Sequence, residues 1–306
     1  MMTSLPNCAP VLFLVFNRPE RTRQVFEAIR AARPPQLFVA ADGPRPDRGA
    51  EAEQCAAVRA IATAVDWPCE LHTLFREGNL GCGRAVSEAI TWFFSQVPEG
   101  IVLEDDCLPD SSFFLFTTLL LERYRTDQRV FKVAGTNPLG TWAGFEGSSY
   151  LFSSYGYSWG WASWRDRWAC FDLQLAAWPR LERSPHARHY PFRRQRNQGF
   201  QATHAGLIDT WDYQWHFAIS CQHGLVAVPS VNLVRNLGFE PDATHTRNRF
   251  SLYGRNAIGR LEAPYREPSF MLPDREYERY MYRLIAREAR REWLSRQWYR
   301  LHRLLR

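Results

Sequence analysis

Residues 100–110 read GIVLEDDCLPD: an apolar run, IVL at 101–103, is followed at once by the carboxylates of Glu104, Asp105 and Asp106. An all-apolar run of this kind predicts a strand that is buried on both faces, as in a parallel sheet. Adjacent carboxylates repel one another and resist burial, so they need a counter-charge, solvent or a cation. The stretch therefore predicts a buried strand that ends at a polar site.

The chain on the N-terminal side of this stretch repeats the same alternation. The apolar runs PVLFLVF (10–16), LFVAA (37–41) and CELHTLF (69–75) each lead into residues with helical spacing. Alternating strands and helices predict an α/β fold with a doubly wound, mostly parallel central sheet flanked by helices. After residue 135 the pattern gives way to a stretch rich in Gly, Ser and aromatic residues, which predicts loops and short strands of the same domain.

The composition describes a globular chain. With 306 residues, 45% hydrophobic and 14% aromatic, it can bury a sizeable core. The net charge is +6 and Lys132 is the only lysine. So many arginines suit a phosphate ligand, although a genomic bias toward arginine codons explains them equally well. Outside the C-terminal tail the basic residues are interspersed with acids, which argues against nucleic acid as a partner.

Cysteine usage and the N-terminal segment bear on the compartment. The seven cysteines show no C-x-x-C spacing, which indicates a reducing compartment and argues against a zinc site or a disulfide framework. The start MMTSLPNCAPVLFLVF lacks a basic region, and its apolar run is about half as long as a membrane span. We therefore expect a cytoplasmic chain without a signal peptide.

Polar residues follow three of the predicted strands. Asp42 ends the second strand, the loop REGNLGCG (76–83) follows the third, and the three carboxylates of residues 104–106 follow the fourth. Because ligands gather at the carboxyl ends of parallel strands, we expect these groups to form one binding site. The alternatives are a plain loop at 76–83 and, for Asp42, a simple D-G turn.

The loop and the first turn supply the remaining candidates for this site. Arg76, Asn79 and Gly81 belong to a glycine-rich loop before a helix N-terminus, an arrangement that suits a phosphate or ribose. Asn17 and Arg18 join them from the turn after the first strand.

Two residues are candidate ligands of a divalent metal, Mn2+ or Mg2+. A metal that also holds phosphate and water needs only one or two carboxylates, and Asp106 is the best placed. The alternative is a solvated acidic turn before a helix capped by Asp110 or Ser111. His245, in the probable loop DATHTRN, can close over a metal and a phosphate, although a lone histidine is more often structural.

The second half of the chain offers aromatic platforms and a candidate base. SSYGYSWGWASWRDRW (153–168) contains Trp159 and Trp161, whose faces suit sugar rings and bases, although tryptophan is also ordinary core filler. DTWDYQWHFA (209–218) predicts a helix with Asp212 among indoles. Burial there makes a carboxylate a stronger base, and pairing with an arginine is the alternative.

Together these segments resemble the GT-A fold, a Rossmann-like fold of nucleotide-sugar-dependent glycosyltransferases. The likeness is to the N-acetylglucosaminyltransferase I-like group and related, family 2-like bacterial glycosyltransferases. It rests on VLEDDCLPDSSFF as that group's E-D-D segment, on the Gly- and Trp-rich stretch, and on DTWDYQW as the segment of its catalytic base. The resemblance implies a GT-A domain over 1–274, with a nucleotide-sugar half over about 1–135 and an acceptor half over about 136–274.

The resemblance also implies roles and an activity. Asp106 binds the metal, Glu104 and Asp105 hold the nucleotide sugar, Asp42 meets the base, and Asp212 is the general base. The implied reaction is the metal-dependent, inverting transfer of a sugar from a nucleotide-diphosphate sugar, with UDP favoured. The implied acceptor is a hydroxyl of a carbohydrate or of a lipid-linked molecule. Such a reaction would belong to surface polysaccharide or glycoconjugate synthesis. The rivals are a sugar nucleotidyltransferase, although FNRPERT after the first strand lacks its glycine-rich loop, and a non-catalytic carbohydrate-binding relative.

The last segment, 275–306, predicts a basic amphipathic helix with interleaved Trp and Tyr. It either lies on an anionic membrane, which would place the protein at the inner face of the membrane, or packs on the core with its arginines in solvent.

Overall fold

The computed structural model describes residues 7–188, 193–239 and 257–287. Its strands are β1 (Val11–Val15), β2 (Gln36–Ala41), β3 (Glu70–Phe75), β4 (Glu99–Glu104), β5 (Cys107–Pro109), β6 (Val130–Ala134), β7 (Tyr150–Ser153), β8 (Trp161–Trp164), β9 (Leu225–Pro229) and β10 (Val234–Asn236). Its α-helices are α1 (Pro19–Ala32), α2 (Glu51–Ala62), α3 (Cys82–Gln96), α4 (Ser111–Tyr124), α5 (Arg165–Trp168), α6 (Trp178–Arg183), α7 (Arg193–His204) and α8 (Asp212–Cys221), followed by a helix over 275–287.

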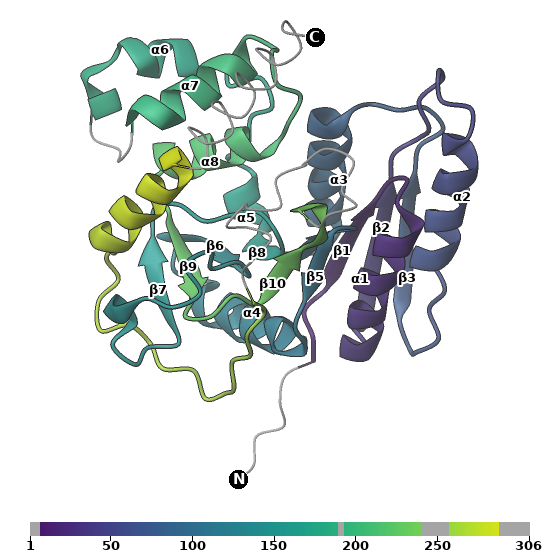
Figure 1. Cartoon of the computed structure of the whole chain (residues 1–306), viewed down its shortest axis with the longest axis horizontal. Helices are drawn as coiled ribbons and strands as arrows, with labels where there is room; N and C mark the ends of the chain where they lie inside the picture. The colour runs from purple at the N-terminus through teal and green to yellow at the C-terminus, as the bar shows by residue number, and fades with distance from the viewer. Residues whose placement is uncertain (1–6, 189–192, 240–256, 288–306) are drawn as a thin grey trace, which may run out of the picture.

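Eight strands form one sheet in the order β3-β2-β1-β4-β8-β6-β9-β7 (Figure 1). The strands β3, β2, β1 and β4 are parallel to one another. β8 lies antiparallel between β4 and β6, and from there the sheet is mixed. The predicted α/β fold with a large, mostly parallel sheet flanked by helices is confirmed, and β8 carries this sheet into the second half of the chain.

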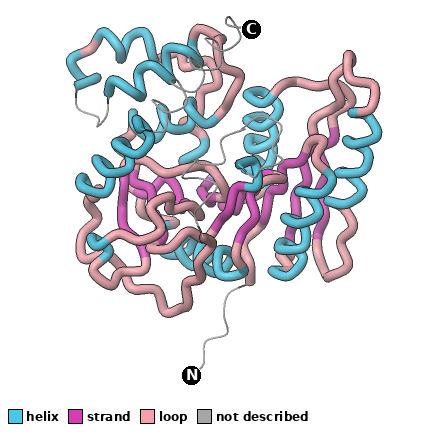
Figure 2. Tube along the Cα trace, in the orientation of Figure 1, coloured by secondary structure: helices cyan, strands magenta, loops and turns pink. Residues whose placement is uncertain are grey.

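Helices cover both faces of the sheet (Figure 2). Successive strand residues point to opposite faces, so Phe13 of β1 joins one core with α1, α2 and α4, while its neighbour Leu12 joins a second core with α3, α5 and α8. The all-apolar run IVL at 101–103 is buried between both layers. A separate ribbon of β5 and β10 follows β4 directly and lies beside the carboxyl end of the parallel strands.

Lys132 on β6 has no exposed surface. Its Nζ donates to the carbonyl oxygen of Gly156 at 2.6 Å and faces the Ser158 hydroxyl at 3.4 Å. Burial lowers the pKa of this amine to about 7, because the charged form loses its hydration.

The helix over 275–287 packs on the second half of the domain. Tyr277 and Met281 are 3% exposed and join the core that contains α3 and α8. Glu278 is buried and accepts hydrogen bonds from the Ser153 hydroxyl and from the backbone N–H and hydroxyl of Ser154. In the described part of the predicted tail the apolar stripe is therefore used for packing. Residues 288–306 lie outside the described ranges.

Within those ranges, no helix combines the length and the apolar character that crossing a bilayer requires.

Candidate functional site

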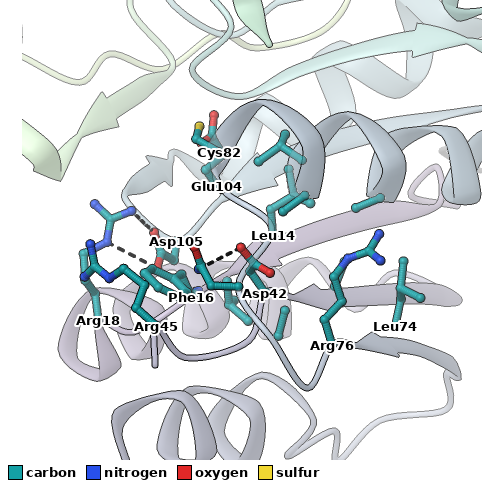
Figure 3. A pocket seen from close by; sticks show the side chains of 18 of the residues that line it. Leu14, Phe16, Arg18, Asp42, Arg45, Leu74, Arg76, Cys82, Glu104 and Asp105 are labelled. Atoms are coloured by element: carbon teal, nitrogen blue, oxygen red, sulfur yellow. Dashed lines mark hydrogen bonds and ion pairs between the residues drawn. The ribbon is translucent and has the colours of Figure 1, made fainter. Parts of the chain in front are cut away.

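A cavity of about 480 Å³ opens at the carboxyl ends of β1, β2 and β4 and at the N-terminus of α3 (Figure 3). Leu14, Ala40, Leu74, Ala85 and Ala89 supply its apolar wall. The polar lining consists of Arg18, Asp42, Arg45, Arg76, Asn79, Glu104, Asp105 and Asp209, with Gly81 and Cys82 at the helix N-terminus. All the predicted nucleotide-sugar residues except Asn17 line this one cavity.

Arg18 is the counter-charge of the acidic strand end. Its Nη2 lies 2.5 Å from Asp105 Oδ1, and its Nη1 lies 2.7 Å from Asp106 Oδ2. The Phe16 N–H also faces Asp105 Oδ2 at 3.4 Å. Asp105 is only 2% exposed, so the guanidinium compensates a carboxylate that is otherwise cut off from water.

Glu104 differs from its two neighbours because no described residue donates a hydrogen bond to its side chain. Burial and the negative charges of Asp106 and Asp105 raise the pKa of Glu104 to about 8. The cavity therefore contains a carboxyl that keeps its proton to higher pH than an ordinary glutamate, and in that form it can donate a hydrogen bond to a ligand.

We expect Glu104→Gln to stabilise the protein at alkaline pH. The folded state holds the Glu104 proton above its ordinary pKa of 4.5, so the wild-type free energy of unfolding falls as pH rises from there toward about 8. Glutamine stays neutral and should unfold at higher urea than wild type at pH 9, by about 1–2 kcal/mol, with no difference at pH 4. The exposed Glu122→Gln is the control, and an equal response of both variants would contradict the assignment.

Asp42 closes the glycine-rich loop onto β2. Its carboxylate accepts the Gly43 N–H at 2.9 Å, the Leu80 N–H at 3.0 Å and the Asn79 side-chain amide at 2.9 Å. Asn79 also donates to the Gly43 carbonyl at 3.0 Å. Burial raises the pKa of Asp42, and the loop N–H groups partly offset that rise. Asp42 and Asn79 thus shape the cavity wall through hydrogen bonds to each other.

The remaining candidates of the first half also have partners in the protein. Arg76 pairs with Glu88 at 2.8 Å. Asn17 lies outside the lining and donates to Glu51 at 2.7 Å. Glu51 also pairs with Arg45, a cavity residue that the sequence did not single out.

Asp209, like Arg45, is a charged residue of the cavity that was not predicted from the sequence. Its Oδ2 accepts the Cys82 N–H at 2.8 Å, and its Oδ1 accepts the Gly83 N–H at 2.9 Å. The sequence predicted that the N–H groups at the start of α3 suit a phosphate. In the structure they donate to a carboxylate of the protein. The segment DTWDYQW, which was chosen for Asp212, also contains Asp209 three positions earlier, so the sequence did offer this candidate.

Asp212 is the first residue of α8, and two buried tryptophans flank it in the chain. Trp211 and Trp215 are 3% and 0% exposed. The Thr210 hydroxyl donates to Asp212 Oδ1 at 2.5 Å, and the Tyr213 N–H donates at 2.9 Å. No described arginine or lysine pairs with this carboxylate within 4 Å, which leaves it available as a base.

Asp212 is linked to the cavity through the chain, because the lining residue Asp209 precedes it by three positions. Burial, followed by the charges of Glu104, Asp209 and Asp212, raises the pKa of the Cys82 thiol to about 12. Asp209 therefore joins the segment of the predicted base to the lining of the cavity.

The two predicted acceptor-lining tryptophans have different positions. Trp161 on β8 has no exposed surface and stacks on Trp211 at 5.7 Å, so we correct its assignment from acceptor lining to core packing. Trp159 is partly exposed, stacks on Tyr157 at 4.7 Å and meets the edge of Phe239 at 5.2 Å. Only Trp159 keeps a surface that an acceptor can reach.

Asp106, the predicted metal ligand, has two neighbours in the protein. Asp106 is 16% exposed, Arg18 binds its Oδ2, and its Oδ1 lies 3.6 Å from the Cys107 thiol. No three His, Cys, Asp or Glu side chains within the described ranges form a group that can hold a metal ion. Arg18 supplies positive charge beside Asp106. A cation at Asp106 stays a prediction; His245 lies outside the described residues.

Comparisons with protein-family models and with curated proteins gave no match. Among solved structures, the chain is similar to a UDP-glucose pyrophosphorylase complexed with UDP-glucose, at 8% identity and a TM-score of 0.39, covering 76% of this chain and 94% of that one. It is also similar to mouse xyloside xylosyltransferase 1 in its apo form, at 9% identity and a TM-score of 0.34, covering 69% and 81%. At these TM-scores neither likeness carries an argument about function.

Proposed function

We propose that this chain is a glycosyltransferase that moves a sugar from a nucleotide-diphosphate sugar, with UDP favoured, to a hydroxyl of a carbohydrate or lipid-linked acceptor. One observation carries the proposal: a cavity at the carboxyl ends of parallel strands is lined by cations and carboxylates, among them Asp209, which lies three residues before Asp212 in the same segment. A cavity of about 480 Å³ is of the size that holds a small ligand or cofactor.

The arrangement supports an inverting displacement. Asp212 takes the proton of the acceptor hydroxyl, whose oxygen bonds to the anomeric carbon as the bond from that carbon to the diphosphate oxygen breaks. The leaving group carries the bonding pair and gains negative charge. Arg18, Arg45 and Arg76 line the cavity and stabilise that charge electrostatically. A divalent cation held at Asp106 would add to the same stabilisation.

The turn after β1 favours this reaction over nucleotidyl transfer. β1 ends at Val15 and α1 begins at Pro19, so three residues connect them. That connection has too little backbone, and no glycine, to wrap a nucleoside triphosphate.

The donor site is tested by a thermal-shift screen of UDP-, GDP-, CMP- and dTDP-linked sugars, each with and without manganese. We expect one nucleotide to raise the unfolding temperature of the wild type and to lose this effect in Arg45→Ala. Arg30→Ala is the control, because Arg30 is an exposed arginine paired on the surface with Asp66. A shift that needs manganese and disappears in Asp106→Ala would support the cation. No shift with any donor would favour the non-catalytic alternative.

A further inference from the structure

The segment that carries Asp212 is tied to the donor cavity by one side chain. Asp209 lies in the connection between α7 and α8, and Cys82 and Gly83 are the first two residues of α3. The two N–H···O bonds join parts of the chain that are 127 and 126 residues apart. The first N–H groups of a helix have no partner within the helix and carry partial positive charge, so a carboxylate is a suitable partner.

Two glycines make this approach possible. A Cβ at Gly81 would lie 2.6 Å from Asp209 Oδ2, and Gly81 has a φ of +81°, which side-chain-bearing residues rarely adopt. A Cβ at Gly83 would lie 2.7 Å from Asp209 Oδ1 and 2.8 Å from the Thr210 carbonyl oxygen. Any larger residue at Gly83 would push the segment away from α3.

The contacts continue from Asp209 to Asp212. The Thr210 hydroxyl donates to Asp212, and the Thr210 carbonyl accepts from the Gln214 side chain at 2.7 Å. Trp211, between them, stacks on the buried Trp161. The segment is thus held by α3 at Asp209 and by the sheet at Trp211, and Asp212 follows directly after these two anchors.

We propose that Asp209 is a positioning residue: by binding the N-terminus of α3, it sets the place of Asp212 relative to a donor in the cavity. This inference rests on the proposed function. Misplacing a base by about 1 Å can cost two orders of magnitude in rate, while the binding of the donor need not change. Asp209 therefore contributes to turnover by positioning Asp212 and takes no part in the chemical step itself.

The test compares Asp209→Ala, Asp209→Asn and Gly83→Ala in the full chain. We expect Asp209→Ala and Gly83→Ala to lower kcat by at least about tenfold, with a donor dissociation constant within about threefold of wild type. Asp209→Asn keeps one of the two acceptor oxygens. Its kcat should therefore lie between the values of the two alanine variants and that of wild type. Asp274→Ala is the matched control, because Asp274 accepts the Glu276 and Tyr277 N–H groups at the start of the helix over 275–287, away from the cavity.

A second readout does not depend on activity. Hydrogen exchange of the peptides covering 80–86 and 207–215 should speed up in Asp209→Ala and in Gly83→Ala, and stay at the wild-type rate in Asp274→Ala. Unchanged exchange, or an unchanged kcat in an active enzyme, would overturn the inference. Equal losses in donor binding and kcat would make Asp209 a donor ligand instead. If wild type transfers no sugar, the proposed function fails while the exchange data still decide whether Asp209 holds the segment.

Discussion

Asp212→Asn is expected to lower the turnover of sugar transfer by two to four orders of magnitude, the usual contribution of a positioned base (~10²–10⁴). Asparagine has nearly the same shape and keeps an oxygen to accept the Thr210 hydroxyl, but it cannot take a proton. The variant should therefore bind the donor as wild type does, and its donor-induced thermal shift should persist. The measurement is kcat with the donor identified in the screen.

The control is Asp172→Asn, the same exchange at a turn aspartate outside the cavity lining, whose carboxylate accepts the Gln174 and Ala176 N–H groups. It should leave kcat unchanged. If Asp212→Asn retained more than about a tenth of wild-type turnover, Asp212 would not be the base, since base removal normally costs far more.

Arg18→Met is expected to lower the free energy of unfolding by about 3 kcal/mol, because removing one partner leaves the buried Asp105 without its counter-charge. Asp106 loses the same partner. Methionine preserves most of the apolar length of the side chain, so the loss reports the charge. Urea unfolding at pH 7 gives the value. The deficit should shrink as pH falls, because protonation of Asp105, whose pKa is raised by burial, removes the uncompensated charge.

Arg30→Met provides the comparison on the surface. Arg30 pairs with Glu27 and Asp66, and all three side chains are about half exposed. Exposed pairs of this kind contribute about 0–1 kcal/mol. Equal losses in both variants would show that the Arg18 cluster is solvated and that its acids do not depend on the guanidinium.

Short-range pattern was enough to predict the parallel half of the sheet. The runs at 10–16, 37–41 and 101–103 are apolar without alternation, and a strand of that kind must be buried on both faces. The place of β8 was not predictable in the same way. WASW pairs with β4 and β6 through contacts that no local period encodes, and these same contacts bury Trp161.

The residues of the candidate site also differ in whether local sequence pattern predicts them. Arg18, Asp42, Glu104 and Asp105 follow strand ends, and the rule that parallel strands end at one edge brings them together. Asp209 comes from a loop far along the chain, and its contact with α3 joins residues 127 positions apart, which no local pattern encodes. The identity of the counter-charge also depended on the fold, because the sequence contains many arginines and only the path of the turn after β1 selects Arg18.

The burial of Lys132 has a consequence for covalent labelling. The chain has one lysine, and in the folded protein its amine is buried and hydrogen-bonded to a backbone carbonyl. Acylating reagents, acetyl groups and ubiquitin all attach to exposed lysine amines. The folded domain offers them none, so a lysine adduct on this protein would mark a chain that had unfolded first.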